Sequence, residues 1–177
     1  MAELLDTDPQ PLVYWDRKQF TNFQDQINSL RGTKVVYIGN LSFQTTEPQI
    51  HQAFSKVGSI KRVIMGLNRF TKEPCGFCFV EYFEHQCALD AVAFLHGTTL
   101  DERIVRVELD WGYHPSRRYG RGESGGQVRD EKRLDYDEGR GGYGRAAMYQ
   151  SMSDPLAEAP IPPSIVSGRR PQRPGVP

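Results

Sequence analysis

The sequence predicts an α+β fold in which a four-stranded antiparallel sheet, connected βαββαβ, carries both helices on one face. Two observations within residues 33–108 lead to this prediction. Short runs of apolar, β-branched and aromatic residues, typical of strands, alternate with segments whose apolar residues recur at helical spacing. Glycines and polar loops separate these runs. Because both helices lie on one side, the other face of the sheet should stay open.

The first strand is expected over Val35–Gly39, followed by a loop at 40–45. Residues 46–49 read Thr-Glu-Pro-Gln, a capping box with proline in the first turn of a helix. Gly58 should end this helix, and a second strand is expected over 60–65. The apolar stripe of the helix is Ile50, Ala53, Phe54 and Val57.

A loop at 66–74 leads to a longer strand over 75–83. A second helix follows and should end at Gly97, because glycine is the preferred residue just past a helix. The last strand is expected over 103–108. The apolar stripe of the second helix is Ala88, Ala91, Val92 and Leu95.

Composition divides the chain into four regions. Residues 1–32 form a polar N-terminal extension with an expected short helix at 23–30, and residues 33–108 form the domain. Residues 109–147 form an extension rich in Gly, Arg and Tyr. Its stretch 112–147 contains nine glycines and almost no apolar residues, so it should have no fixed conformation alone. Residues 148–177 have the Pro, Ser, Ala and Arg content of a disordered tail.

The charge balance restricts how the chain could hold a nucleic acid. The formal net charge is zero, and residues 33–108 carry eight Lys or Arg against eight Asp or Glu. Proteins that bind mainly through phosphates are usually basic, so RNA contact should depend on shape and on bases. Three cysteines without an apolar N-terminal stretch argue against secretion and disulfides. No apolar run reaches the length of a membrane span.

The strand at 75–83 should form part of a binding platform. Side chains alternate along a strand, so Phe77 and Phe79 share a face with Glu81, whose burial without a partner would be costly. This face should therefore be the open one, and Tyr37 should lie beside the phenylalanines. Three exposed rings invite base stacking, at about 1–3 kcal/mol per base. Alternatively, the protein's own extensions cover the platform. The opposite set, Cys78, Val80 and Tyr82, should face the helices.

These strands resemble a known RNA-binding family. Residues 75–82, Cys-Gly-Phe-Cys-Phe-Val-Glu-Tyr, are similar to the longer signature of the RNA-recognition motif, and residues 36–41, Val-Tyr-Ile-Gly-Asn-Leu, resemble the shorter one. Cys75 and Cys78 depart from the longer signature, replacing its basic and its small residue. Loss of the basic residue weakens generic RNA binding and agrees with the neutral charge.

A more specific resemblance, to the small subunits of nuclear cap-binding complexes, covers residues 12–146. It implies binding of the 7-methylguanosine cap at RNA 5′ ends, a nuclear location with shuttling to the cytoplasm, and support of pre-mRNA splicing, processing and RNA export. It also implies a partner, a large helical-repeat subunit that orders the extensions. The similar segments are 37–43, 64–67, 75–82 and, most specifically, the glycine-rich 119–131 and 135–144.

The resemblance implies the residues of a cap pocket. The methylated guanine is cationic, and the family sandwiches it between two tyrosines that correspond to Tyr37 and Tyr14, with Trp15 as the alternative to Tyr14. Phe77 and Phe79 complete the stacking platform. The guanine edge presents two donors and one acceptor, so it calls for carboxylates and a donor. The matching residues are Arg106, Glu108, Asp110 and the main chain of Leu109.

The triphosphate needs positive charge and donors. The family's phosphate and ribose contacts correspond to Arg117, Arg121, Gln127 and the backbone near Val128. By composition alone, residues 109–147 fit a flexible RNA-binding tail equally well. The resemblance instead implies a segment that is disordered when free and folds over the cap.

Other classes of function have little support in the sequence. No Ser-His-Asp, Walker or metal–carboxylate arrangement is present, so neither an enzyme nor a cofactor is expected. Cys75 and Cys78 have zinc-like spacing, but they should point to opposite faces and no second pair completes a site. Two alternatives stay open: a general single-stranded RNA-binding splicing or mRNP factor, and a protein-interaction scaffold on which Cys87 and Phe94 face a partner.

Overall fold

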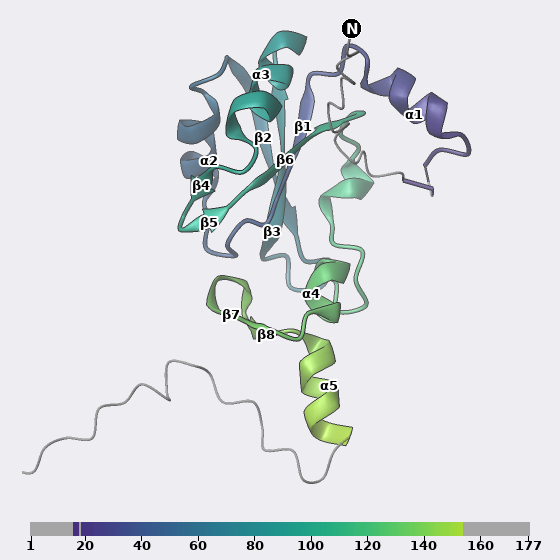
Figure 1. Ribbon diagram of the computed structural model, residues 1–177, viewed down its shortest axis with the longest axis vertical. Coiled ribbons are helices and arrows are strands. Elements are labelled where there is room, and N and C mark those ends of the chain that lie inside the picture. The colour runs from purple at the N-terminus through teal and green to yellow at the C-terminus, as the bar shows by residue number, and fades with distance from the viewer. Residues whose placement is uncertain (1–15, 18, 154–177) are drawn as a thin grey trace, which may run out of the picture.

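The computed structural model describes residues 16–17 and 19–153 (Figure 1). The expected stacking residue Tyr14 and its alternative Trp15 lie outside the described residues. Within those ranges, no helix is both long and apolar enough to cross a membrane. The same ranges hold no cluster of His, Cys, Asp and Glu suited to a metal ion.

The expected βαββαβ order is confirmed. The two helices between the strands, α2 (Glu47–Phe54) and α3 (His85–Leu95), cover one face of an antiparallel sheet (Figure 1). The capping box expected at the start of α2 forms, with the Thr46 backbone N–H donating to Gln49 Oε1 at 2.8 Å. From one edge to the other, the strands are β2 (Ile60–Leu67), β3 (Pro74–Tyr82), β1 (Val35–Gly39) and β6 (Arg106–Asp110).

The face under the helices holds the main hydrophobic core. Side chains from β3 alternate as expected, so Cys78, Val80 and Tyr82 are fully buried among Phe54 and other apolar residues of α2, α3 and β1. The Tyr82 hydroxyl donates to the Phe54 carbonyl at 3.1 Å, which satisfies the one polar group of this large side chain. The other face of the sheet must therefore provide any binding platform.

The last strand differs from the prediction of 103–108. A separate hairpin forms first, in which β4 (Thr99–Leu100) pairs with β5 (Arg103–Ile104). Asp101 and Glu102 form its turn with positive φ angles of 48° and 61°. The strand that joins the sheet, β6, then begins at Arg106 and runs to Asp110. The shift matters because it places Asp110 within the sheet, opposite Val35 of β1.

Flanking elements complete the described chain. The expected N-terminal helix α1 (Phe23–Leu30) is confirmed, and Asn22 caps it by accepting from the Gln24 N–H at 3.0 Å. The glycine-rich region has a defined path, although we expected no fixed conformation for it alone. Contacts to the domain hold it, including hydrogen bonds from Arg140 to Leu41 and from Arg103 to Asp137. Its elements are η1 (Pro115–Arg118), α4 (Val128–Lys132), β7 (Tyr136–Asp137), η2 (Glu138–Arg140), β8 (Gly142–Tyr143) and α5 (Arg145–Ser153), which runs across the expected boundary at 147.

Candidate nucleic-acid interface

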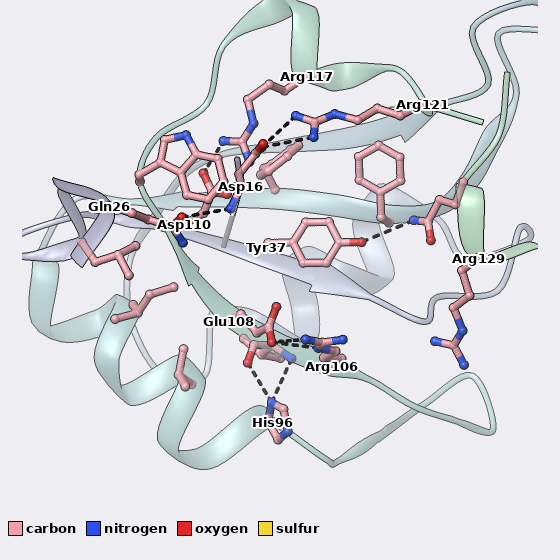
Figure 2. Close-up of a pocket in the computed structure, with 18 of the residues that line it drawn as sticks. Asp16, Gln26, Tyr37, His96, Arg106, Glu108, Asp110, Arg117, Arg121 and Arg129 are labelled. Atoms are coloured by element: carbon pink, nitrogen blue, oxygen red, sulfur yellow. Dashed lines mark hydrogen bonds and ion pairs between the residues drawn. The ribbon is translucent and has the colours of Figure 1, made fainter. Parts of the chain in front are cut away.

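A cavity of about 890 Å³ opens along β6, between the sheet and the glycine-rich region (Figure 2). Strands β1, β3 and β6 provide its floor, and residues after Asp110 provide its wall. Every described residue that the sequence assigned to cap binding lines this cavity. These residues are Tyr37, Phe77, Phe79, Arg106, Glu108, Leu109, Asp110, Arg117, Arg121, Gln127 and Val128.

Three aromatic rings form the floor, because the strand register brings them together. Tyr37 of β1 pairs with Phe79 of β3, and their ring centroids are 5.7 Å apart. The Tyr37 ring also stacks on Phe77 at 5.8 Å with an interplanar angle of 29°. Burial raises the pKa of Tyr37 to about 12, so the phenol is neutral at physiological pH. Tyr37 thus offers a flat, electron-rich ring to the cavity.

The expected exposure of Phe77 and Phe79 is wrong. Phe77 is only 5% exposed and Phe79 only 2%. The Phe77 ring lies over β2 at Gly66, where an added Cβ would come within 2.4 Å of it. Tyr113 covers Phe79 with a centroid distance of 5.6 Å. The alternative that the protein's own extension covers the platform is therefore correct for Phe79, whereas Phe77 is covered within the domain and Tyr37 is half-buried.

Asp110 is already fully occupied. Its two oxygens accept hydrogen bonds from the two terminal nitrogens of Arg117, each at 2.6 Å (Figure 2). Asp110 Oδ1 also accepts from the Gly112 N–H at 2.9 Å. The Asp110 side chain is 4% exposed and that of Arg117 is 13% exposed. Arg117 also lies over the ring of Trp111 at 4.1 Å. The expected guanine acceptor and the expected phosphate donor thus bind each other in this structure.

The pair formed by Glu108 and Arg106 is looser. Arg106 Nε donates to Glu108 Oε1 at 2.8 Å, and the two side chains are 53% and 29% exposed for Arg106 and Glu108 (Figure 2). Exposed pairs of this kind contribute about 0–1 kcal/mol, so a ligand can separate them at little cost. Glu108 lies directly opposite Tyr37 in the sheet, at the edge of the stacking surface. Leu109 turns its side chain to the helix-covered core and can offer only its main chain.

Cations and donors line the opposite side of the cavity. Arg121 donates to Asp16 through both terminal nitrogens at 3.1 Å, and Gln127 Nε2 donates to the Tyr37 hydroxyl at 3.4 Å (Figure 2). Val128 begins α4 and is exposed. Positive charge therefore lies across the cavity from the acids of β6, an arrangement suited to a ligand with one cationic and one anionic end.

The sequence interpretation missed several lining residues. Trp111 packs edge-on against Phe20 at 5.3 Å and contacts Arg117, so it joins the N-terminal segment to the cavity wall. Its position beside Asp110 was a usable signal, because a tryptophan next to an acid expected in the pocket should itself lie near the pocket. The other missed lining residues are Asp16, Gln26, Leu30, Val92, Ala93, His96, Val107, Tyr119, Gly120 and Arg129.

The lining has two parts that differ in chemistry. Residues of α1 and α3, such as Leu30 and Val92, provide apolar side chains at one part of the lining. The part over Tyr37 combines an aromatic floor with acids and cations. Only this second part has the chemistry to recognise a charged, planar ligand.

The chain is similar to known RNA-binding proteins. The RNA recognition motif family matches residues 36–106. The chain is 57% identical to "Nuclear cap-binding protein subunit 2" of Schizosaccharomyces pombe over 128 aligned residues. The aligned stretch covers 72% of this chain and 70% of the relative. The protein of the same name from Xenopus laevis is 54% identical, over 75% of this chain and 86% of that protein. The Dictyostelium discoideum relative is 50% identical, and the chain spans 63% of its length.

Two solved structures are similar to this chain over less than half of its length. The structure titled "Structure of RNA15 RRM" is 28% identical, with a TM-score of 0.42, over 45% of this chain and 91% of that one. A second structure of that motif, with bound RNA, has a TM-score of 0.41 over 44% of this chain and 83% of that one.

Proposed function

The chain belongs to the family of nuclear cap-binding protein subunit 2, and from this premise we propose that it binds the 7-methylguanosine cap at RNA 5′ ends. It does so as the non-catalytic small subunit of a heterodimeric complex in the nucleus. We further propose that its partner is a large helical-repeat subunit, that the complex shuttles to the cytoplasm, and that it supports splicing, processing and export of RNA.

One observation carries the proposal. Tyr37 offers an aromatic ring between the acids of β6 and the donors of the glycine-rich region. A cap has a cationic, planar base at one end and a triphosphate at the other. Stacking on Tyr37 would let Glu108 face the guanine edge while Arg121 and Gln127 face the phosphates.

The second stacking residue is proposed to be Tyr14, with Trp15 as the alternative. Both lie outside the described residues, but Asp16 lines the cavity and forms an ion pair with Arg121. The described start of the chain is therefore at the binding site, and the two candidates directly precede it in sequence.

Guanine recognition by Asp110 requires an exchange of partners. Its carboxylate would have to release Arg117 to accept from the base, and this release would free Arg117 for the triphosphate. Glu108 is the more accessible acceptor because its pair with Arg106 is exposed. We therefore propose that Glu108 and Arg106 form hydrogen bonds with the guanine edge first. The ion pair between Asp110 and Arg117 then separates as the cap reaches its final bound position.

The scaffold alternative keeps one supporting observation. Phe94 of α3 is 69% exposed, as expected for a residue that faces a partner. Cys87 behaves differently, because it packs against Gly58 and the core instead. A partner surface on α3 is compatible with cap binding on the opposite face of the sheet, so the two functions do not compete.

Retention on immobilised 7-methyl-GTP tests the proposal. The full chain, with and without the large subunit, should be retained and should be displaced by free 7-methyl-GTP but not by GTP. Tyr37→Ala should abolish retention. Phe83→Ala provides a matched control, because Phe83 is an exposed aromatic residue outside the cavity. Elution by GTP and 7-methyl-GTP at equal concentrations would contradict cap recognition.

A further inference from the structure

Arg140 is a buried cation that the proposed function does not use. Only 3% of the residue is exposed, although it belongs to a glycine-rich segment near the end of the described chain. A buried guanidinium is costly unless its donors are satisfied. Its hydrogen bonds therefore indicate what the position is for.

These hydrogen bonds join three separate segments. Nη1 donates to the Leu41 carbonyl at 3.0 Å and to the Gly76 carbonyl at 3.4 Å, which connects Arg140 to the loop after β1 and to the first part of β3. Nε donates to Asp130 Oδ1 at 2.7 Å, and Nη2 donates to Asp130 Oδ2 at 2.5 Å. Arg140 thus connects α4, through Asp130, to Leu41 and Gly76 of the domain.

Gly76 makes this approach possible. Its φ angle is +82°, and a Cβ added there would lie 2.5 Å from Arg140 Nη1 and 2.8 Å from the Leu41 carbonyl oxygen. Any other residue would push the guanidinium out. The glycine that belongs to the RNA-recognition-motif signature therefore also makes room for a side chain from the C-terminal extension.

The remaining contact reaches the cavity. Arg140 Nη2 donates to Gln127 Oε1 at 3.3 Å. Because arginine can only donate, this contact holds the oxygen of the Gln127 amide toward Arg140 and turns its nitrogen the other way. That nitrogen donates to the Tyr37 hydroxyl at 3.4 Å at the cavity wall. Without Arg140 the amide could rotate and present its oxygen to the cavity, where it would repel phosphate.

We infer that Arg140 is a positioning residue for the ligand's phosphate end: it fixes the Gln127 amide so that a hydrogen-bond donor, not an acceptor, faces the cavity. The inference rests on the proposed cap binding and adds a residue that does not touch the ligand. Asp130 shares the role because its carboxylate holds the guanidinium in place from the other side.

A purely structural role for Arg140 makes a different prediction. A tether would hold the whole extension, and its loss would weaken every ligand of the cavity equally. A positioning role affects only the part of the ligand that Gln127 meets. Comparing 7-methyl-GTP with the nucleoside 7-methylguanosine, which has the base but no phosphate, separates the two.

The test uses the full chain and its tryptophan fluorescence, to which Trp111 contributes as a residue that lines the cavity. Arg140→Lys keeps the charge but replaces three donor nitrogens with one, so it cannot reach Asp130, Gln127 and the Leu41 carbonyl in the same geometry. It should weaken binding of 7-methyl-GTP about tenfold, as expected for a lost hydrogen bond to a charged group. Binding of 7-methylguanosine should change less than about twofold. Gln127→Met, which has no donor, should reproduce this selective loss.

The double variant provides the critical measurement. If Arg140 acts through Gln127, Arg140→Lys should cause no further loss of 7-methyl-GTP binding in the Gln127→Met background, because the two changes break one connection. Asp130→Asn should give a smaller loss with the same selectivity, and it serves as the second variant if Arg140→Lys does not fold.

The outcomes separate the inference from its premise. If the parent chain does not bind 7-methyl-GTP, the proposed function fails. Two results would overturn the inference and make Arg140 only a tether, given that the parent chain binds. The first is that the losses of 7-methyl-GTP affinity from Arg140→Lys and Gln127→Met add. The second is that Arg140→Lys weakens binding of the nucleoside as much as binding of the triphosphate.

Discussion

The two faces of one sheet are built from different interactions. The helix-covered face buries aliphatic and aromatic side chains, and the Tyr82 hydroxyl there finds a backbone partner. The other face buries aromatic rings beneath a glycine-rich segment that charged groups hold in place. Three of the ion pairs on this face are Asp110–Arg117, Asp130–Arg140 and Asp137–Arg103.

The difference teaches what each face can do. Apolar burial is non-directional and contributes about 1.5–3 kcal/mol for each large side chain. The helix-covered face therefore provides stability, but it has no charged partner that a ligand could replace. A buried ion pair adds little net stability because its desolvation cost is high, yet it fixes geometry. Such a pair can also be exchanged for a charged ligand. The charged face is therefore the one on which a ligand can compete.

The largest expected effect compares Phe54 with Phe77, one phenylalanine from each face. Both are at least 95% buried, so either Phe→Ala change should lower the unfolding free energy by about 3–5 kcal/mol. Only Phe77→Ala should also weaken binding of 7-methyl-GTP at temperatures where the protein is folded, because Tyr37 stacks on the Phe77 ring. Urea titration and fluorescence titration measure the two quantities.

The proposed difference between the two faces is wrong if Phe54→Ala weakens binding of 7-methyl-GTP as much as Phe77→Ala does. Retained binding in Phe77→Ala, despite a loss of stability, would also contradict the prediction, since Tyr37 would then be held by β1 alone. In that case the buried rings of the platform would be core residues only.

A smaller effect is expected from Asp110→Asn. Removing one charge from a buried pair leaves Arg117 uncompensated, which should cost about 3 kcal/mol of stability. Binding of 7-methyl-GTP should weaken by about 1.5–3 kcal/mol, because a carboxylate that accepts from the base is replaced by an amide. Glu108→Gln is the matched control for stability, since its exposed pair should contribute less than about 1 kcal/mol. Unchanged cap affinity in the Asp110 variant would remove Asp110 from the pocket.

Strand alternation was sufficient to predict the platform but not its cover. The pattern of β3 correctly separated Phe77 and Phe79 from Cys78 and Val80. Glu81 correctly marked the face without helices, where Lys61 and Arg62 of β2 pair with its carboxylate. The expected exposure of the rings on that face failed, because Tyr113 covers Phe79 and Phe77 packs over Gly66. One face can thus be open at one end and covered at the other.

The remaining misses have one physical origin. Residue periodicity reports apolar burial, whereas the extension is held by ion pairs and hydrogen bonds between residues far apart in sequence. Arg140 meets Leu41 across 99 positions, and no local pattern reports that contact. The same limitation applies to β6, whose start depended on a hairpin turn at Asp101 and Glu102. The family resemblance located the pocket residues, but the partners of Asp110 and Arg117 required coordinates.

The smallest expected effect concerns the contact that joins β7 to the loop after β1. Arg103 donates to Asp137 at 2.5 and 2.7 Å and also to the Asn40 carbonyl at 3.1 Å. Hydrogen bonds from Arg103 hold the pKa of Asp137 below its ordinary value of 3.8, against an opposing effect of burial. A carboxyl with a lowered folded-state pKa stabilises the fold above its unfolded pKa, and this contribution is lost as pH falls through the folded value.

Hydrogen exchange of β7 and β8 should therefore show full protection at pH 6 and reduced protection below about pH 4. Protection factors, not raw rates, are needed because intrinsic exchange itself depends on pH. Asp137→Asn should lower protection at pH 6 and flatten its pH dependence, while amides of β1 in the helix-covered core keep theirs. Because Glu81 and Glu131 also have lowered pKa values, only the part of the dependence that Asp137→Asn removes belongs to this pair. Equal loss of protection in β1 and β7 would mean that the extension and the domain unfold together. The charged face would then be as permanent a part of the fold as the helix-covered face.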